Sequence, residues 1–378
     1  MSNIRDLTGL LPDQAMRAMI GRIATGPELS KPLSEAEARY GMRCILEHDA
    51  DPVQSAIFLI ALRMKRETPE ENRGVLAAIR DATETADVDG DDLVDLADPY
   101  SGYSRTLPAA PFLPCILSAC GVPTLSHGVA RMGPKFGATH RQVLAAAGVN
   151  VNLSVQAAAA QIEGSAGWAY LDQASFCPQL AALESLRERM VKRPVLTTVE
   201  VLARPLIARG RSHLLTGYVH KPYPPVYTML ARFVGYDSAL LIRGTEGGVV
   251  PSLRQQGRAV RYEGLGEDED IELLPIDCGI HQDVRAPAIP SEVTSSHSDI
   301  EVHGAPPFSV GLLARVSADA GSKALEGQSG PVRDSLVYAG AHILFHSGRS
   351  GNLQEASELV RRALDNGAAH SKFQLALG

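Results

Sequence analysis

The sequence has little that would place it in a membrane or in an oxidising compartment. No apolar run in its 378 residues reaches the roughly 18 residues that a membrane-spanning helix needs. The first residues lack the apolar stretch of a signal peptide, so we expect none. The five cysteines are widely spread and form no CxxC pair, which argues against a disulfide framework and against a zinc site. We therefore expect a cytoplasmic protein without a membrane partner.

A general excess of positive charge is also missing. The net charge of −7 argues against a general nucleic-acid binder. Residues 121–225 differ from the rest, because they contain eleven Lys and Arg residues but five Asp and Glu residues. Either these basic residues lie on a solvated surface, or the segment holds an anionic ligand.

Residues 1–85 contain several sequence patterns that are typical of helix N-termini. A capping box at Ser34–Glu37 marks the first helix N-terminus, Asp51 before Pro52 the second, and Thr68 the third. Apolar residues at helical spacing follow each of them. These signals predict an N-terminal helical domain.

We interpret the Asp-rich stretch 87–98 as a connection. After it, short β-prone runs alternate with helical segments. The alternation predicts an α/β fold, with a larger domain over 90–378 built on a central, mainly parallel sheet flanked by helices. Residues 244–330 are rich in Gly, Pro, Ser and acids and are expected to form long loops with a few short strands. The expected strands are 122–126, 168–172, 212–219 and 238–243. The expected helices are 108–120, 138–147, 154–163, 178–190, 195–207, 223–234, 331–346 and 353–366.

Several phrases occur in an order that is typical of one known family. They are Ser126–Gly128, Gly137–Val149, Asp172–Leu180, Leu186–Arg193 and Arg243–Gly248. This order resembles the anthranilate phosphoribosyltransferase-like family (glycosyltransferase family 3, with nucleoside phosphorylases as relatives). The resemblance spans nearly the whole chain and is interrupted mainly at 254–330.

The resemblance implies a fold and an activity. Part of 174–200 would join the helical domain, and the protein would form a homodimer through that domain. The activity would be transfer of a pentosyl group from phosphoribosyl pyrophosphate to an amine acceptor, as in tryptophan biosynthesis.

Two motifs of the family are altered here, which marks a divergent branch. The Gly-rich loop that cradles the diphosphate of the donor corresponds to Asp98–Arg105, which keeps one glycine and gains two tyrosines. The Asp-Glu pair that binds Mg²⁺ corresponds to Val249 and Val250, which have no ligand atom. We therefore expect no tightly bound cofactor and no dedicated metal site. Glu246 is the nearest carboxylate and a weak metal candidate, and Mg²⁺ would arrive mainly with the donor's phosphates.

The resemblance also suggests which residues contact ligand, although catalytic residues stay unassigned. His127 and Gly128 end an apolar strand, where parallel sheets place their ligands, but His127 is alternatively a structural histidine. Lys135 stands in a Gly-bracketed turn before a helix and would be a counter-charge for phosphate, or part of an ordinary turn. Arg187 would hold an acceptor carboxylate, or pair with Glu184 or Glu188 on a helix surface.

The loop after residue 97 and a polar-aromatic turn complete the candidate ligand site. Asp98, Tyr100, Ser101 and Gly102 would hold the donor's phosphates. The turn that contains His220 and Tyr223 either stacks a ring or is an ordinary Pro-rich turn. We expect these residues to share one concave site between the two domains.

Two function classes remain open. One is a phosphoribosyltransferase whose anthranilate turnover is slow or absent, and the other is a non-enzymatic binder of nucleic acid or nucleotides. A shorter branch of the family, proposed to bind nucleic acid, shares the Thr245–Gly247 and Phe176–Pro178 phrases. For the dimer, Met16, Met19, Ile20 and Ile23 offer an apolar stripe that either meets a second subunit or packs internally.

Overall fold

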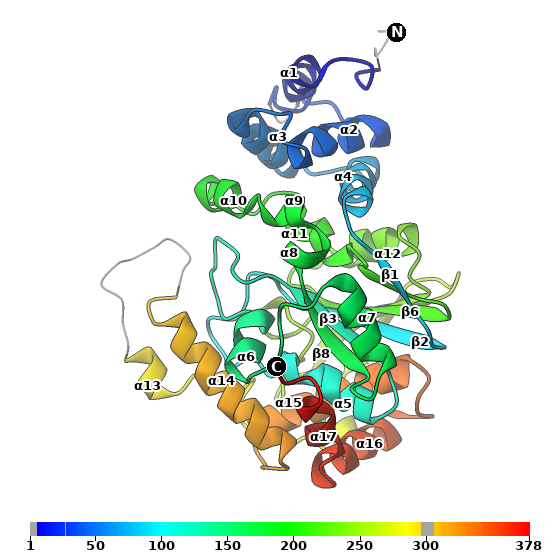
Figure 1. Cartoon of the computed structure of the whole chain (residues 1–378), viewed down its shortest axis with the longest axis vertical. Coiled ribbons are helices and arrows are strands. Elements are labelled where there is room, and N and C mark those ends of the chain that lie inside the picture. Colours follow the sequence, from blue (N-terminus) through cyan, green and yellow to red (C-terminus); the bar gives the residue numbers. More distant parts are fainter. Residues whose placement is uncertain (1–5, 27, 296–305) are drawn as a thin grey trace.

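Four helices form the N-terminal part of the chain, which lies at the top of Figure 1. The structure is a computed structural model that describes residues 6–26, 28–295 and 306–378. The predicted start signals act as expected, because Ser34, Asp51 and Thr68 each accept a hydrogen bond from a backbone N–H of the first helical turn. The helices are α1 (Pro12–Ile23), α2 (Glu35–Leu46), α3 (Pro52–Lys65) and α4 (Pro69–Asp81).

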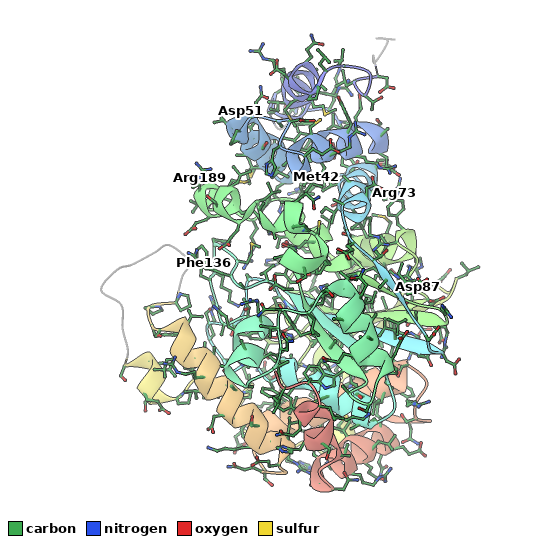
Figure 2. All side chains as sticks on the ribbon, viewed as in Figure 1. Met42, Asp51, Arg73, Asp87, Phe136 and Arg189 are labelled. Carbon is green, nitrogen blue, oxygen red and sulfur yellow. The ribbon has the colours of Figure 1, made fainter. Side chains whose placement is uncertain are left out.

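The apolar stripe of α1 packs inside this bundle. Met16, Met19 and Ile23 are fully buried within the chain, whereas Ile20 is partly exposed. Helix α1 packs on α2 and α3, and Met42 of α2 also lies inside the bundle (Figure 2). The stripe is therefore not a free surface for a second subunit, and the internal alternative is the correct one.

A seven-stranded sheet forms the centre of the remaining chain. Its order is β4-β3-β2-β6-β7-β8-β9. The first five strands pair in parallel, and β8 pairs antiparallel with both β7 and β9. The predicted α/β class with a helical N-terminal part is confirmed. The strands are β2 (Asp92–Ala97), β3 (Thr124–Gly128), β4 (Trp168–Asp172), β6 (Arg211–Gly217), β7 (Ser238–Ile242), β8 (Gly257–Glu263) and β9 (Glu269–Leu273). A separate parallel pair, β1 (Ala86–Val88) with β5 (Leu206–Ala208), lies where the predicted domain boundary falls.

Helices cover both faces of the sheet, because alternate side chains along each strand point to opposite faces. Leu93 of β2 and Leu241 of β7 join the core that includes the N-terminal bundle, whereas Leu96 and Leu240 join a second core. Helices α7 (Val155–Glu163) and α12 (Pro224–Phe233) lie on the first face. The second face packs against α5 (Leu113–Ala119), α6 (His140–Ala146), α14 (Val310–Leu325), α15 (Pro331–His346), α16 (Leu353–Asp365) and α17 (Ala368–Gln374).

Three sequence interpretations are wrong. The Asp-rich stretch 87–98 is not only a connection, because it contains the central strand β2. Residues 244–330 contain the short strands β8 and β9, as expected, but the 16-residue helix α14 was not expected there; residues 296–305 lie outside the described part of the chain. The predicted helix 195–207 breaks at Arg204, which has a φ of 49° and precedes Pro205, so the chain ends this segment in β5.

Short elements complete the connections between the strands. The predicted helix 178–190 is divided into two. The remaining helices are α8 (Gln173–Phe176), α9 (Pro178–Ala181), α10 (Glu184–Met190), α11 (Leu196–Val199) and α13 (Ser291–Thr294), and the 3-10 turns are η1 (Ala110–Phe112), η2 (Glu200–Leu202), η3 (Thr245–Gly247) and η4 (Pro275–Cys278). Over the described ranges, no helix is both long and apolar enough to pass through a bilayer.

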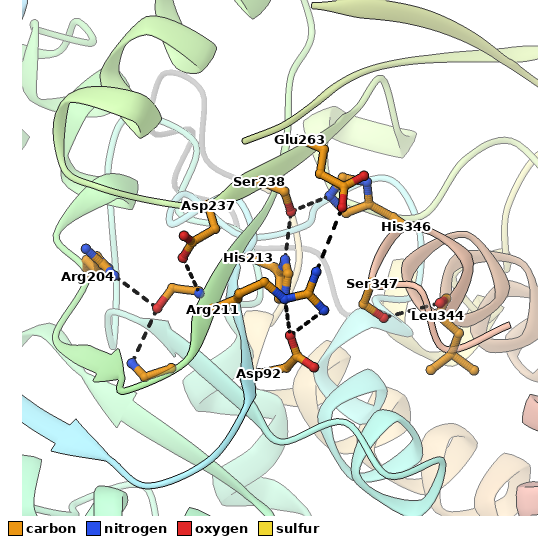
Figure 3. A network of polar contacts seen from close by, with 12 residues as sticks. Asp92, Arg204, Arg211, His213, Asp237, Ser238, Glu263, Leu344, His346 and Ser347 are labelled. Atoms are coloured by element: carbon orange, nitrogen blue, oxygen red, sulfur yellow. Dashed lines mark hydrogen bonds and ion pairs between the residues drawn. The ribbon is translucent and has the colours of Figure 1, made fainter. Parts of the chain in front are cut away.

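A polar network ties the amino ends of the central strands together (Figure 3). Nε2 of His213 on β6 lies 2.9 Å from the Asp92 carboxylate on β2, and its Nδ1 lies 2.7 Å from the Ser238 hydroxyl on β7. Ser238 also lies 2.9 Å from Nε2 of His346 on α15. Burial lowers the pKa of His346 to about 3, helped by the nearby His213 and Arg261. The network holds this end of the sheet and leaves the opposite, carboxyl end for ligands.

Glu71 provides a test of the helical part. This fully buried carboxylate accepts hydrogen bonds from the Leu33 and Thr68 N–H groups and lies 2.5 Å from Nζ of Lys65. Removing a buried partner leaves the other groups uncompensated, so Glu71→Ala should reduce the free energy of unfolding by about 3 kcal/mol. Urea denaturation followed by circular dichroism measures this loss. The matched control is Glu70→Ala, whose exposed side chain should leave the midpoint nearly unchanged; equal midpoints for both variants would contradict the assignment.

Candidate functional site

A cleft opens at the carboxyl ends of the parallel strands, where α/β sheets bind their ligands. Segments that follow β2, β3, β6 and β7 form one wall, and the helical layer of α3, α11, η2 and α12 forms the other. Of the residues predicted from the sequence, Tyr100, Ser101, His220, Tyr223 and Glu246 line this cleft. The cleft residues that the predictions did not assign to a ligand site include Arg63, Arg193, Thr198, Glu200 and Tyr227.

The loop after β2 is folded back on the chain rather than open toward a ligand. The Asp98 carboxylate accepts hydrogen bonds from the Tyr103 hydroxyl and the Val249 N–H, at 2.5 and 2.9 Å. Gly102 has a φ of 69°, and a Cβ there would lie 2.5 Å from the carbonyl oxygen of Gly137. The Gly102 N–H donates to Pro99, and the Tyr103 N–H to Ala138. Asp98 and Gly102 therefore shape the loop, and the Gly102 and Tyr103 N–H groups are not free for phosphate.

His127 belongs to a buried chain of polar groups. Its Nε2 lies 2.8 Å from the Asp95 carboxylate, and its Nδ1 contacts the Tyr100 hydroxyl. Asp95 also accepts a hydrogen bond from Tyr236 at 2.6 Å. Burial raises the pKa of Tyr100 well above its usual value, so this phenol stays protonated. The structure places His127 and the following Gly128 behind the cleft wall, with Tyr100 between the histidine and the cleft.

A second chain of the same kind lies beside it. Nε2 of His140 lies 2.8 Å from the Asp98 carboxylate, and its Nδ1 lies 3.1 Å from the Ser126 hydroxyl. Ser126 is fully buried. A serine that no substrate reaches is not a nucleophile, so this Ser-His-Asp arrangement holds the strand ends in place.

Lys135 forms an ion pair with Glu246, and the Glu246 carboxylate accepts hydrogen bonds from three further donors. Nζ of Lys135 lies 2.5 Å from Oε2 of Glu246. The Ser104 and Arg105 N–H groups donate to the same carboxylate at 3.0 and 2.9 Å, and the Thr106 hydroxyl donates to it at 2.9 Å. The counter-charge predicted for a phosphate is therefore already neutralised by a side chain of the protein.

Electrostatics favour the charged form of Glu246. Burial opposes its charge, but the Lys135 ammonium and the two backbone donors outweigh burial and lower the pKa of the carboxyl. Burial lowers the pKa of Lys135, and the Glu246 carboxylate opposes that shift. Lys135 and Glu246 therefore form an ion pair that is mostly buried, with 13% of the Lys135 side chain and 6% of the Glu246 side chain exposed.

The residues at the family's metal position do not fit Mg²⁺. Val249 and Val250 are buried and apolar, and the Val249 N–H is bound to Asp98. Glu246 is held by Lys135 and the segment 104–106, so it is not a free ligand for a hard cation. No group of three or more His, Cys, Asp or Glu residues within the described ranges has a metal-binding arrangement.

Arg187 is also occupied from within the chain. Its guanidinium donates two hydrogen bonds to the carboxylate of Glu200, at 2.6 and 2.7 Å, and both side chains are almost fully buried. This bidentate geometry is the one that a ligand carboxylate would use. Because Glu200 binds the guanidinium, Arg187 is not free to hold the carboxylate of an acceptor. It also does not pair with Glu184 or Glu188, the alternative that the sequence left open. Glu184 and Glu188 pair with Arg131 instead.

Aromatic rings and cations line the helical side of the cleft. The Arg63 guanidinium contacts the Tyr223 hydroxyl and lies over its ring, 5.3 Å from the centroid. The rings of His220 and Tyr227 flank Tyr223, with centroids 6.4 and 6.2 Å away. Arg193 lines the cleft and has no hydrogen-bonding or ionic partner among the residues that the structure describes. Arg63 lies in the last turn of α3, where the helix dipole alone explains a basic residue, so the sequence carries no specific sign of a ligand role.

Comparisons with known proteins agree with this architecture. The glycosyl transferase family, helical bundle domain, matches residues 17–83. An anthranilate phosphoribosyltransferase from Methylocella silvestris is 28% identical over 360 residues, covering 94% of this chain and 93% of the relative. One from Rhodopseudomonas palustris is 26% identical over 361 residues, covering 94% and 96%.

Solved structures show the same fold. The anthranilate phosphoribosyltransferase of Thermus thermophilus superimposes with a TM-score of 0.72 at 20% identity, covering 96% of this chain and 98% of that one. The Saccharomyces cerevisiae enzyme, solved with PRPP and Mg, superimposes with a TM-score of 0.73 at 14% identity, covering 96% of each chain. The helical bundle and the mainly parallel sheet are therefore the fold of these two solved enzymes. Over nearly its whole length the chain is similar to anthranilate phosphoribosyltransferases, and its N-terminal part matches the helical bundle domain of the glycosyl transferase family.

The Arg187–Glu200 pair gives a test of the site's internal electrostatics. Arg187→Met or Glu200→Leu each leaves one buried charge without its partner, so each should reduce the free energy of unfolding by about 3–5 kcal/mol. The double variant removes both charges and should recover most of that loss. Urea denaturation of the four proteins measures the coupling. Arg189→Met, on the same helix (Figure 2), is the exposed control and should unfold like the unaltered protein. Strictly additive losses would show that the two groups do not stabilise each other.

Proposed function

We propose that this protein binds a phosphoribosyl pyrophosphate-type donor in the cleft and transfers its pentosyl group to an amine. The observation that carries the proposal is the position of the cleft, at the carboxyl ends of β2, β6 and β7. Its opposite wall contains Arg63 of α3 and Arg193 of the connection between α10 and α11. The relatives that share this architecture are pentosyl transferases by name.

The reaction forms a bond between C1 of the pentose and the acceptor nitrogen and breaks the bond from C1 to the diphosphate oxygen. The amine loses one proton, and the diphosphate leaves with the electron pair of the broken bond. Because the transition state carries positive charge on the ring, as at other glycosidic carbons, the protein contributes positioning and charge complementarity. Arg193 is placed to bind a donor phosphate, and Arg63, whose guanidinium lies 3.7 Å from the Glu67 carboxylate, adds positive charge to the same cleft. The rings of Tyr223 and Tyr227 are placed to flank a planar acceptor.

The acceptor we propose lacks the carboxylate of anthranilate. Arg187 is saturated by Glu200, and Glu200 itself lines the cleft, so it repels a second carboxylate. A neutral or cationic aromatic amine avoids this repulsion. Mg²⁺ would arrive with the phosphates of the donor, because the residues at the family's metal position do not fit the ion.

Binding to nucleic acid is not the function that we favour. The basic excess of 121–225 is largely used in ion pairs within the chain, which leaves few free cations on a common surface. These pairs are Arg131 with Glu184 and Glu188, Lys135 with Glu246, Arg141 with Asp172, Arg187 with Glu200, Arg209 with Asp89, and Arg211 with Asp92. An affinity for oligonucleotides that fell steeply with salt would instead support the binding function.

A donor-binding experiment tests the proposal. Phosphoribosyl pyrophosphate with Mg²⁺ should raise the melting temperature, since a ligand of the native state stabilises it. Arg193→Ala should weaken donor binding by about tenfold, the effect of losing one charge-assisted contact. Anthranilate consumption should stay near background.

The control for Arg193 is Arg189→Ala. Arg189 lies on α10, and its guanidinium donates a hydrogen bond to the Ser185 carbonyl oxygen. This variant should bind the donor like the unaltered protein. Absence of any donor-induced shift would remove the proposed function, and rapid anthranilate turnover would remove the proposed acceptor class.

We also propose that the protein is a homodimer through α3. One side of α3 is buried in the bundle, through Phe58, Leu59 and Leu62. The opposite side is apolar as well, with 66% of Val53, 39% of Ile57 and 76% of Met64 exposed. Apolar side chains on the side of a helix that faces away from its own core mark an interaction surface, and a second copy of the same helix is one way to cover them.

The dimer proposal predicts the effect of a charge on this side of α3. Met64→Glu buries an unpaired carboxylate at the interface, so its dimer dissociation constant should rise by at least about tenfold. Light scattering at micromolar concentration measures the mass. Leu265→Glu, in the exposed turn between β8 and β9, should leave the dimer intact. A monomeric unaltered protein would refute the dimer, and an intact Met64→Glu dimer would place the interface elsewhere.

A further inference from the structure

Four donors from two separate segments converge on one carboxylate at the cleft wall. The Ser104 and Arg105 N–H groups and the Thr106 hydroxyl follow β2, and the Lys135 ammonium follows β3. The Glu246 carboxylate that receives them follows β7 and lines the cleft. We call these four donors the 104–106/135 anion site.

The chemistry of this donor set is that of phosphate recognition. Consecutive backbone N–H groups, a hydroxyl and an ammonium are the groups that hold phosphate oxygens in many proteins. The two oxygens of Glu246 are bound separately: Oε1 accepts from Arg105 and Thr106, whereas Oε2 accepts from Ser104 and Lys135. Two oxygens of a phosphate group can take the same four donors. The site therefore contains what a phosphate needs, and a side chain of the protein fills it.

The backbone at Glu246 is strained and has glycines close by on both sides, which permits the carboxylate to change position. Glu246 has a φ of 55°, a left-handed conformation that costs free energy in any residue with a Cβ. Gly244 precedes it by two positions, and Gly247, with a φ of 86°, follows it directly. Its backbone lies in a single 3-10 turn, η3, so a rotation there need not disturb β7.

We propose that Ser104, Arg105, Thr106 and Lys135 form a binding site for a phosphate or diphosphate group, and that Glu246 is a built-in competitor which must leave before the ligand binds. The contact is autoinhibitory: the protein's own carboxylate lowers the affinity of the site for an external anion. The ligand class rests on the proposed function, since a phosphoribosyl donor carries such groups. The competition itself does not depend on any turnover.

Titration calorimetry with inorganic pyrophosphate, in the absence of added metal, tests this inference. Glu246→Ala empties the site without removing a donor, so its affinity for pyrophosphate should exceed that of the unaltered protein by about tenfold or more. Glu246→Gln keeps the side-chain shape and removes the charge, so it should show a smaller gain. This second variant keeps the test valid if Glu246→Ala does not fold.

Two controls separate the site from general charge effects. Glu267→Ala removes one acid from an exposed turn and should leave pyrophosphate affinity unchanged. Adding Lys135→Ala to Glu246→Ala should abolish the gain, because the ammonium is part of the site.

The inference is overturned if neither Glu246 variant binds pyrophosphate more tightly than the unaltered protein, or if Glu267→Ala gains as much. The outcome is distinct from a failure of the proposed function. A gain in pyrophosphate affinity without any pentosyl transfer would support the anion site and refute the enzyme, whereas transfer without the gain would do the reverse.

Discussion

The ion pair between Lys135 and Glu246 joins segments that follow three different strands of the sheet. Through Glu246, the turn after β7 is attached to residues 104–106 after β2 and to the turn after β3. A carboxylate with so little exposure needs a partner of opposite charge, and an ammonium in the same place needs one as well. The shape of this end of the cleft therefore depends on one internal salt bridge and its three accessory hydrogen bonds.

The same principle explains the acceptor side. Arg187 is too deeply buried to stay unpaired, and Glu200 satisfies it with the bidentate geometry that a ligand carboxylate would adopt. In both places a glutamate of the chain forms an ion pair with a basic residue that the family resemblance had assigned to ligand binding. An incoming anion must compete with an internal one, so its affinity is the difference between two binding free energies. This difference favours ligands that are more highly charged than a carboxylate, which a diphosphate is and anthranilate is not.

Local patterns predicted much of the fold, because helix caps and apolar spacing act within a few residues. The capping residues Ser34 and Thr68 begin helices as expected, and the strand 168–172 has the predicted bounds. The central strand β2 escaped prediction because Asp92, Asp95 and Asp98 are poor strand formers or polar strand ends. Their partners, such as His213, Tyr236 and His140, lie 42 to 141 residues away in sequence.

The site was predicted less completely for a related reason. Sequence motifs located the loops that reach the cleft, and Tyr100, Ser101, His220 and Tyr223 are lining residues. They did not show which charges are already paired. Glu200 follows Arg187 by 13 residues with no periodic relation, and Glu246 meets Lys135 only because the parallel sheet brings the ends of β3 and β7 to one edge. Pairing of that kind is a property of the tertiary structure.

A crystal structure of the protein with phosphoribosyl pyrophosphate bound would test the central claim most directly. The account predicts that the Glu246 carboxylate has left the Ser104 and Arg105 N–H groups, that a phosphate of the donor has taken its place beside Lys135, and that the Arg187–Glu200 pair is intact. A donor bound in the cleft with Glu246 still hydrogen-bonded to Ser104, Arg105 and Lys135 would contradict it.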